Sequence, residues 1–177
     1  AVALRAQAVG IVDPASGHLE GQVPLAATPS HMVRGDGAVW VSAADADSVI
    51  RIDGHERSVR QTIRVGNGPS GLAIADGAAW AVDPYGGLLY RIQLPGGNVV
   101  TTIRVGQGAE AVAAGRGAIW VANPVAGVVL RIDPRNQRPA ARLPLGSPPL
   151  GLATTTDRVW VTTGGAPDTT TSAASSC

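Results

Sequence analysis

The chain has one cysteine, no lysine and no phenylalanine. The single cysteine is Cys177, the last residue, which excludes a disulfide bond within the chain. Every one of the 14 basic residues is therefore an arginine, and 13 acidic residues balance them to a formal net charge of +1. So small a charge excludes a strong electrostatic attraction to phosphate backbones, and we expect no nucleic-acid partner.

Long apolar runs and the common catalytic motifs are also missing. The uncharged stretch 117–130 is too short to span a membrane and contains Asn123-Pro124, so we expect no membrane span in this chain. No segment carries a helical stripe that continues past its glycines, which argues against a helical solenoid. The three histidines are scattered, no serine has a nucleophile-elbow context, and no glycine-rich loop leads into a helix.

What the chain does contain is glycine, proline and a strict repeat. The 177 residues include 23 glycines and 13 prolines and are 45% apolar, a mixture that favours many short strands joined by tight turns. The four tryptophans share one spacing of 40 residues, at Trp40, Trp80, Trp120 and Trp160. A sequence period of this length is typical of a repeat architecture.

When the 40-residue units are aligned, other positions also recur with the period of the tryptophans, and we call each set of aligned positions a column. An arginine follows each of the first three tryptophans by eleven residues, at Arg51, Arg91 and Arg131, and an aspartate recurs two positions later at Asp53 and Asp133. Because alternate residues of a strand share a face, we expect Arg51 to pair with Asp53 and Arg131 with Asp133. The tryptophans and arginines are interpreted as structural residues of the repeat.

Each unit contains four short apolar segments separated by turn-forming residues. In the second unit these segments are 72–75, 78–82, 88–93 and 99–105, and Asp76-Gly77 and Pro95-Gly96-Gly97-Asn98 are two of the separators. Four strands in about 40 residues indicate an all-β fold, the β-propeller built of four-stranded blades. The tryptophan of the second strand is expected to fill the space between neighbouring blades.

The repeat divides the chain into three complete blades and two half-blades. The complete units are residues 31–70, 71–110 and 111–150, and residues 1–30 and 151–163 are partial units that supply two outer and two inner strands. These halves either close a four-blade ring or leave an open arc of a larger propeller, and the small size of a four-blade ring favours the arc. Residues 164–177 are small and polar and are predicted to form a disordered tail of low complexity.

The phrase GAIWVANPVAGVVLRIDPRNQRPAARLPLGSPPLGLA at residues 117–153 resembles the YVTN-type propeller repeat of bacterial proteins. It is also similar to the virginiamycin B lyase-like group, and the resemblance covers about residues 8–163. It implies a propeller fold, and because such repeats occur in sensors, surface proteins and a few enzymes, it leaves the function open. It leads us to expect an extracellular, periplasmic or cell-surface location.

Residues that break a column are candidates for a site. His31 stands where other units have Gly71, Ala111 and Gly151, and Glu110 breaks the neighbouring column of Ser30, Ser70 and Leu150. Both lie where an inner strand begins, near the mouth of the expected channel. A histidine and a glutamate there are candidates for a catalytic base and acid or for metal ligands, and the alternative interpretation is ordinary surface variation.

A second set of candidates lies in the loops between second and third strands. Asp83 and Tyr85 in the second unit, and Asn123 in the third, are candidate ligand-binding residues on the same face. The alternative is a proline-containing turn with an exposed aromatic ring.

Two functions follow from these observations. The first is a non-catalytic binding module, a sensor or scaffold whose channel face takes a small molecule, peptide or protein, with no cofactor. The second is a metal-dependent eliminating lyase of the virginiamycin B lyase type, in which, as the resemblance implies, His and Glu act with a divalent metal such as Mg²⁺.

Overall fold

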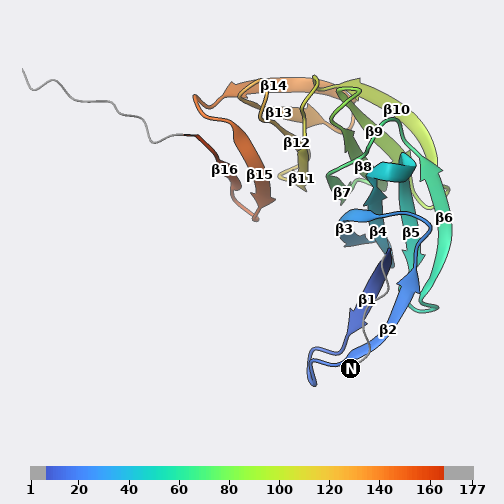
Figure 1. Cartoon of the computed structure of the whole chain (residues 1–177). Helices are drawn as coiled ribbons and strands as arrows, with labels where there is room; N and C mark the ends of the chain where they lie inside the picture. Colours follow the sequence, from blue (N-terminus) through green and yellow to red (C-terminus); the bar gives the residue numbers. More distant parts are fainter. Residues whose placement is uncertain (1–6, 166–177) are drawn as a thin grey trace, which may run out of the picture.

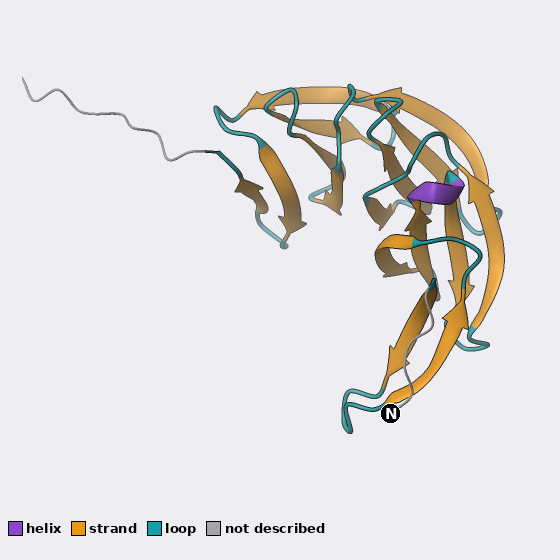
Figure 2. Ribbon diagram, viewed as in Figure 1, coloured by secondary structure: helices purple, strands orange, loops and turns teal. Residues whose placement is uncertain are grey.

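The computed structural model describes residues 7–165, and all of its regular structure in that range is β-strand apart from one short 3₁₀ turn at Ala44–Ala46 (Figure 2). Most of the expected tail and Cys177 lie outside the described residues. No helix in the described range is long and apolar enough to cross a membrane.

Within residues 7–165, sixteen strands form three four-stranded antiparallel sheets and two two-stranded ones. The three complete sheets run in chain order from an inner to an outer strand, and the predicted strands of the second unit agree with β7–β10 to within a residue. The complete blades are β3 (Pro29–Gly35), β4 (Ala38–Ala43), β5 (Ser48–Asp53) and β6 (Ser58–Arg64); β7 (Leu72–Ala75), β8 (Ala78–Asp83), β9 (Leu88–Gln93) and β10 (Asn98–Arg104); and β11 (Ala111–Gly115), β12 (Ala118–Asn123), β13 (Val128–Asp133) and β14 (Arg138–Pro144).

The two remaining sheets are the predicted half-blades. β1 (Ala8–Val12) pairs with β2 (Leu19–Pro24), and β15 (Pro149–Thr154) pairs with β16 (Val159–Thr163). Figure 1 shows them at opposite ends of an open arc, with the three complete blades between them. Of the two arrangements that the sequence allowed, the described residues therefore adopt the open arc.

The turn between the first and second strands explains why each blade folds back so tightly. Asp36-Gly37, Asp76-Gly77 and Arg116-Gly117 all have positive φ at both residues. Two consecutive left-handed residues define a type I′ turn, whose twist matches that of the flanking strands, and glycine adopts this conformation without steric cost.

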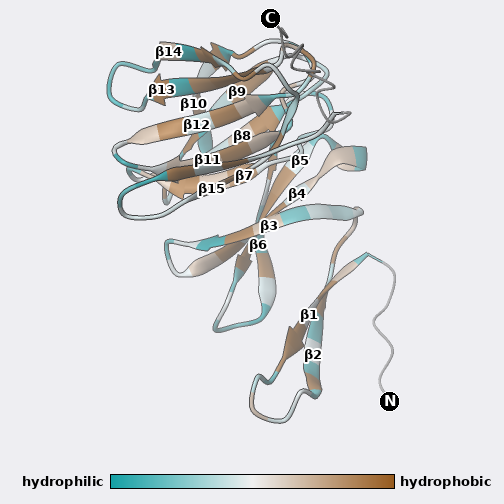
Figure 3. Ribbon diagram, turned by 90° about the vertical axis from the view of Figure 1, so that its left-hand side faces the viewer, coloured by the Kyte–Doolittle hydropathy of each residue, from teal (hydrophilic) through white to brown (hydrophobic). Residues whose placement is uncertain are grey.

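The core consists of apolar contacts between successive blades. Strand interiors are apolar and turns are polar (Figure 3), and apolar clusters cover both sides of the middle blade, β7–β10. Trp40 and Trp80 are fully buried, and their indole nitrogens donate to the carbonyl oxygens of Gly35 and Ala75. Trp40 and Trp80 thus lie in the apolar clusters between successive blades.

The arginine column packs differently from the expectation. The guanidinium groups of Arg51 and Arg91 lie 5.7 and 5.8 Å from the ring centroids of Trp40 and Trp80, at cation–π range. Arg51 is 4.0 Å from Asp36. The predicted Arg51–Asp53 pair was wrong. Asp53 accepts hydrogen bonds from the amides of the turn that follows it, and it forms an ion pair with Arg60.

Candidate functional site

The starts of the inner strands converge on a pocket on the concave side of the arc. We call it the channel-face pocket; its volume is about 490 Å³, within the range of small-molecule sites. Residues within or just before the inner strands of all three complete blades and of the C-terminal half-blade line it. Its lining residues are Ser30, His31, Ser70, Gly71, Pro84, Glu110, Ala111, Val112, Leu150, Gly151 and Leu152.

His31 and Glu110, the two residues that break their columns, line this one pocket although 79 positions separate them in the sequence. Both are solvent-exposed. Val112, Leu150 and Leu152 supply the apolar part of the lining. The pocket thus combines one imidazole, one carboxylate and an apolar surface, which suits an amphipathic ligand.

A chain of serine hydroxyls fixes the strand starts relative to one another. The Ser42 hydroxyl lies 3.0 Å from the Ser30 hydroxyl and donates to the backbone carbonyl of Ser70 at 2.6 Å. The Ser70 hydroxyl donates in turn to the backbone carbonyl of Glu110 at 2.9 Å. Because these bonds cross from the first complete blade to the third, they hold the backbone beneath the pocket in place.

Gly71 allows the second and third blades to approach closely at the same point. A Cβ on Gly71 would lie 2.7 Å from the carbonyl oxygen of Glu110 and 3.0 Å from the amide nitrogen of Val112. Any larger residue there would push the inner strands apart. Gly71 is therefore needed for the pocket's shape.

The three loop candidates separate into buried and exposed residues. Asp83 and Asn123 are buried. The Asp83 carboxylate accepts from the amides of Asn67 and Gly86, and the Asn123 side-chain amide donates to three carbonyl oxygens of the preceding inter-blade loop, those of Val105, Gly106 and Gln107. Both side chains connect a blade to the loop that leads into it.

Tyr85 is the exposed member of that set, at 73%. It lines a shallow hollow of about 440 Å³ with Pro84, Gln107, Gly108, Glu110 and Val125. Since Pro84 and Glu110 also line the channel-face pocket, the two hollows adjoin. The prediction of ligand binding in this loop thus depends on Tyr85, beside Glu110.

The Asp83 carboxylate also affects its partly buried neighbour Tyr90. Burial raises the pKa of the Tyr90 phenol above its usual value, and the negative charge of Asp83 raises it further. Tyr90 therefore stays protonated under ordinary conditions and is no candidate for a base.

The donor set of the pocket does not fit a divalent metal. Mg²⁺ in proteins is held by oxygen ligands, commonly one or two carboxylates with waters or phosphates. The pocket offers one carboxylate, and within residues 7–165 no three His, Cys, Asp or Glu side chains are grouped so that they would hold an ion. Ser70, a further oxygen, is already engaged with a backbone carbonyl.

The sequence missed Ser42, although a signal for it exists. Its column holds Val82 and Ala122 in the next two blades, so a serine there is a polar residue at a buried strand position. A buried hydroxyl requires hydrogen-bond partners, and that requirement pointed to a network.

No protein-family model matches the sequence, and no curated protein matches it. Solved structures do match. A streptogramin B lyase structure aligns with a TM-score of 0.76 at 20% identity, over 89% of this chain and 55% of that one. Hydrazine synthase of Kuenenia stuttgartiensis aligns with a TM-score of 0.73 at 21% identity, over 78% and 43%. Glutaminyl cyclase of Myxococcus xanthus aligns with a TM-score of 0.59 at 15% identity, over 83% and 73%.

These likenesses and the blades define the class of the molecule as a β-propeller protein. Its fold is that of the virginiamycin B lyase-like propellers, as the repeat predicted. The chain spans about half the length of the first two structures that it matches.

Proposed function

We propose that the chain is a non-catalytic binding module whose ligand occupies the channel-face pocket. The observation that supports this most is the convergence of four inner strands on one pocket that contains an apolar wall and only two ionisable side chains. Such a lining suits recognition, because apolar area supplies affinity and a few polar groups fix orientation. Action outside the cytoplasm belongs to the same proposal and rests on the repeat type alone.

The chemistry of the pocket favours a small molecule or peptide that carries a cation and an apolar group. Glu110 supplies the negative charge, and Leu150, Leu152 and Val112 supply the apolar contact. Tyr85, in the adjoining hollow, extends the surface available to a peptide. Short peptides with one arginine and one leucine are therefore the appropriate probes.

A titration with an arginyl-leucine dipeptide amide, followed by NMR of backbone amides, tests the proposal. We expect saturable shifts at Gly71, Ala111 and Gly151. Glu110→Gln should weaken binding by up to about fivefold, as expected for an exposed ion pair worth about 0.2–1 kcal/mol.

Glu56→Gln is the matched control, since Glu56 is an exposed carboxylate in the turn after β5, where it pairs with Arg60 at 3.1 Å. It should leave the affinity unchanged. Shifts that map elsewhere on the arc, or equal effects of the two variants, would contradict the proposed site.

The second candidate is an eliminating lyase, and the specific observation that favours it is that His31 and Glu110 line one pocket. In such a reaction His31 would take a proton from carbon as the base, and Glu110 would protonate the leaving oxygen as the acid. The streptogramin B lyase structure supports the fold of this candidate.

Incubation of the purified protein with a cyclic depsipeptide, with and without Mg²⁺, tests the lyase candidate by chromatography of the linear product. Turnover that His31→Ala abolishes would support it. No ring opening in either condition, together with no Mg²⁺ binding in titration calorimetry, would exclude it.

A further inference from the structure

The two half-blades leave two strand edges uncovered that are covered in every complete blade. By the 40-residue repeat, β1 and β2 correspond to the third and fourth strands of a blade, and β15 and β16 correspond to the first and second. Within the described residues β1 pairs only with β2, and β16 pairs only with β15. In complete blades the second strand pairs with the third, so the open edges of β16 and β1 are complementary to each other.

The register of the complete blades specifies how these edges would pair. Trp40 lies opposite Arg51, Trp80 opposite Arg91 and Trp120 opposite Arg131. By the same register one repeat further, Trp160 would lie opposite Ile11 and Arg158 opposite Asp13. The complete blades have alanine where Arg158 stands, so this junction alone places a cation across from a carboxylate.

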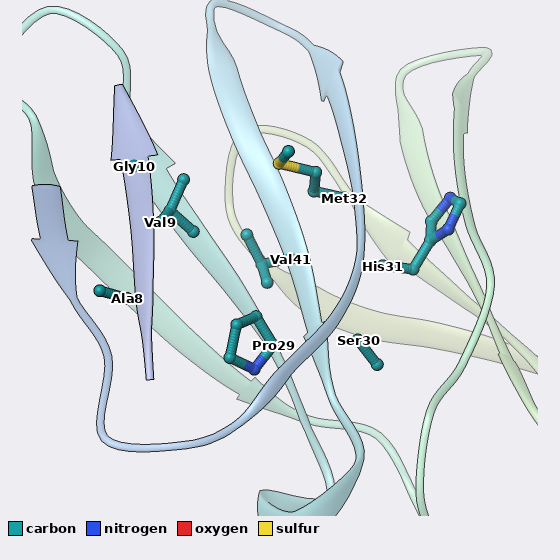
Figure 4. A pocket seen from close by; sticks show the side chains of 8 residues that line it. All are labelled: Ala8, Val9, Gly10, Pro29, Ser30, His31, Met32 and Val41. Carbon is teal, nitrogen blue, oxygen red and sulfur yellow. The ribbon is translucent and has the colours of Figure 1, made fainter. Parts of the chain in front are cut away.

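The N-terminal end of the arc carries an apolar pocket beside the β1 edge. Its volume is about 230 Å³, and Figure 4 shows Val9, Val41 and Met32 among the residues that line it, together with the polar Ser30 and His31. Met32 is 60% exposed, whereas Leu72, its equivalent in the next blade, is 2% exposed because a preceding blade covers it. This end therefore lacks the inner strands of a neighbouring blade.

The C-terminal end carries the converse defect. Trp160 is 58% exposed, although Trp40 and Trp80 are fully buried. Leu143 and Leu145 are exposed, whereas their equivalents Ile103 and Val105 are buried. They line a hollow of about 330 Å³ together with Trp120, Val159 and Val161. This end therefore lacks the outer strands of a neighbouring blade.

Each end holds what the other end lacks. Val12 of β1 is 57% exposed, but its equivalents Ile52, Ile92 and Ile132 are buried against the preceding blade. In the 40-residue repeat, the surface that would precede β1–β2 is the C-terminal hollow beside β14 and β16. Trp40 shares a core cluster with Leu72 and Ala81 of the following blade. The corresponding contacts of Trp160 would be with Met32 and Val41, which line the N-terminal pocket.

We propose that a second copy of this chain covers both ends. β16 of each copy pairs with β1 of the other, so that β15–β16 and β1–β2 from different copies make one four-stranded blade. Two such junctions join two arcs into a closed eight-blade ring, which lies within the usual four to eight blades of propellers. Closure also removes the exposed edges, which otherwise favour open-ended association.

Three observations favour a second copy over another partner. The complementary strands are both present on this chain in the required order, their register sets Arg158 against Asp13, and the apolar surfaces at the two ends are complementary. In addition, the arc leaves a little under half of the streptogramin B lyase chain unmatched, which is about what a second arc would fill.

The mass of the chain in solution tests this proposal. Light scattering after size exclusion should give twice 17.9 kDa, and the value should not rise with concentration because a closed ring has no free end. Val12→Glu should give the single-chain mass, since it places a charge in the apolar hollow of the other copy. Val12 is exposed in the single chain, so the variant should fold.

Val100→Glu is the matched control, because Val100 is 47% exposed on the outer strand β10, away from both ends. It should keep the doubled mass. Iodide should quench Trp160 in Val12→Glu and leave it protected in the unchanged chain. A single-chain mass for the unchanged protein, a mass that grows with concentration, or a doubled mass in Val12→Glu would each overturn the proposal.

Discussion

At the scale of residues, Asp13 and Asp53 hold the turns that follow β1 and β5. Asp13 accepts hydrogen bonds from the amides of Ala15 and Ser16 and from the Ser16 hydroxyl, and Asp53 accepts from the amides of His55 and Glu56. The Ser16 hydroxyl and the Ala15 amide lower the pKa of Asp13 below its usual value. The amides of Glu56 and His55, with a smaller effect of Arg60, do the same for Asp53.

This arrangement predicts a loss of stability in acid. Each folded-state pKa lies below that of the unfolded chain, about 3.9, so the ionised carboxylates stabilise the fold fully above that pH. The contribution is lost as the pH falls through the folded-state values. The midpoint of urea unfolding should therefore be lower at pH 3 than at pH 6.

The double variant Asp13→Asn with Asp53→Asn isolates this effect, since asparagine keeps an accepting oxygen and does not titrate. Its midpoint should change less between pH 3 and pH 6 than that of the unchanged chain. An equal change in both proteins would show that other carboxylates cause the acid sensitivity.

Single residues also show which parts of the candidate site could be predicted from the sequence. His31 and Glu110 were detectable because each breaks a repeat column, and both line the channel-face pocket. Asp83 and Asn123 were chosen by their position in a loop, but the burial of their side chains depends on the inter-blade loop that folds against them. Such a contact between separate segments leaves no local signal.

At the scale of elements, the strands were predictable because turn chemistry delimits them. Asp76-Gly77 requires positive φ at two residues, and this requirement sets the end of β7 and the start of β8. Irregular pairing was not predictable. The register shifts between the third and fourth strands of all three complete blades, as between Arg51 and Ile52, and no residue type marks these shifts.

The mistaken Arg51–Asp53 pair has the same origin. Alternation placed the two side chains on one face of β5, which is correct for an ideal strand. Asp53 is the last residue of β5, however, and the backbone amides of the turn lie nearer to its carboxylate than the guanidinium does. Arg51 lies over the Trp40 ring instead.

At the scale of the whole molecule, the repeat determines the structure of each blade but not the number of blades or whether they close into a ring. The same columns serve a four-blade ring, a larger ring or an arc, because each blade contacts only its neighbours. Curvature arises from the small rotation between stacked blades, which depends on the summed packing of Trp40, Trp80 and the residues around them. The open arc of Figure 1 is the outcome of that packing.

The same neighbour-only stacking predicts a gradient of local stability along the arc. The blade β7–β10 is covered on both sides by apolar clusters, one shared with β3–β6 and the other with β11–β14. The half-blade β15–β16 has an exposed tryptophan and an open edge. In the single-chain variant Val12→Glu, hydrogen exchange measured by mass spectrometry should therefore be slowest in β8 and β9 and fastest in β15–β16.

In the unchanged chain, ring closure by a second copy should slow exchange in β16 and β1 and leave β8 as it was. Equal protection of all blades in the variant would contradict the neighbour-only stacking on which this gradient depends.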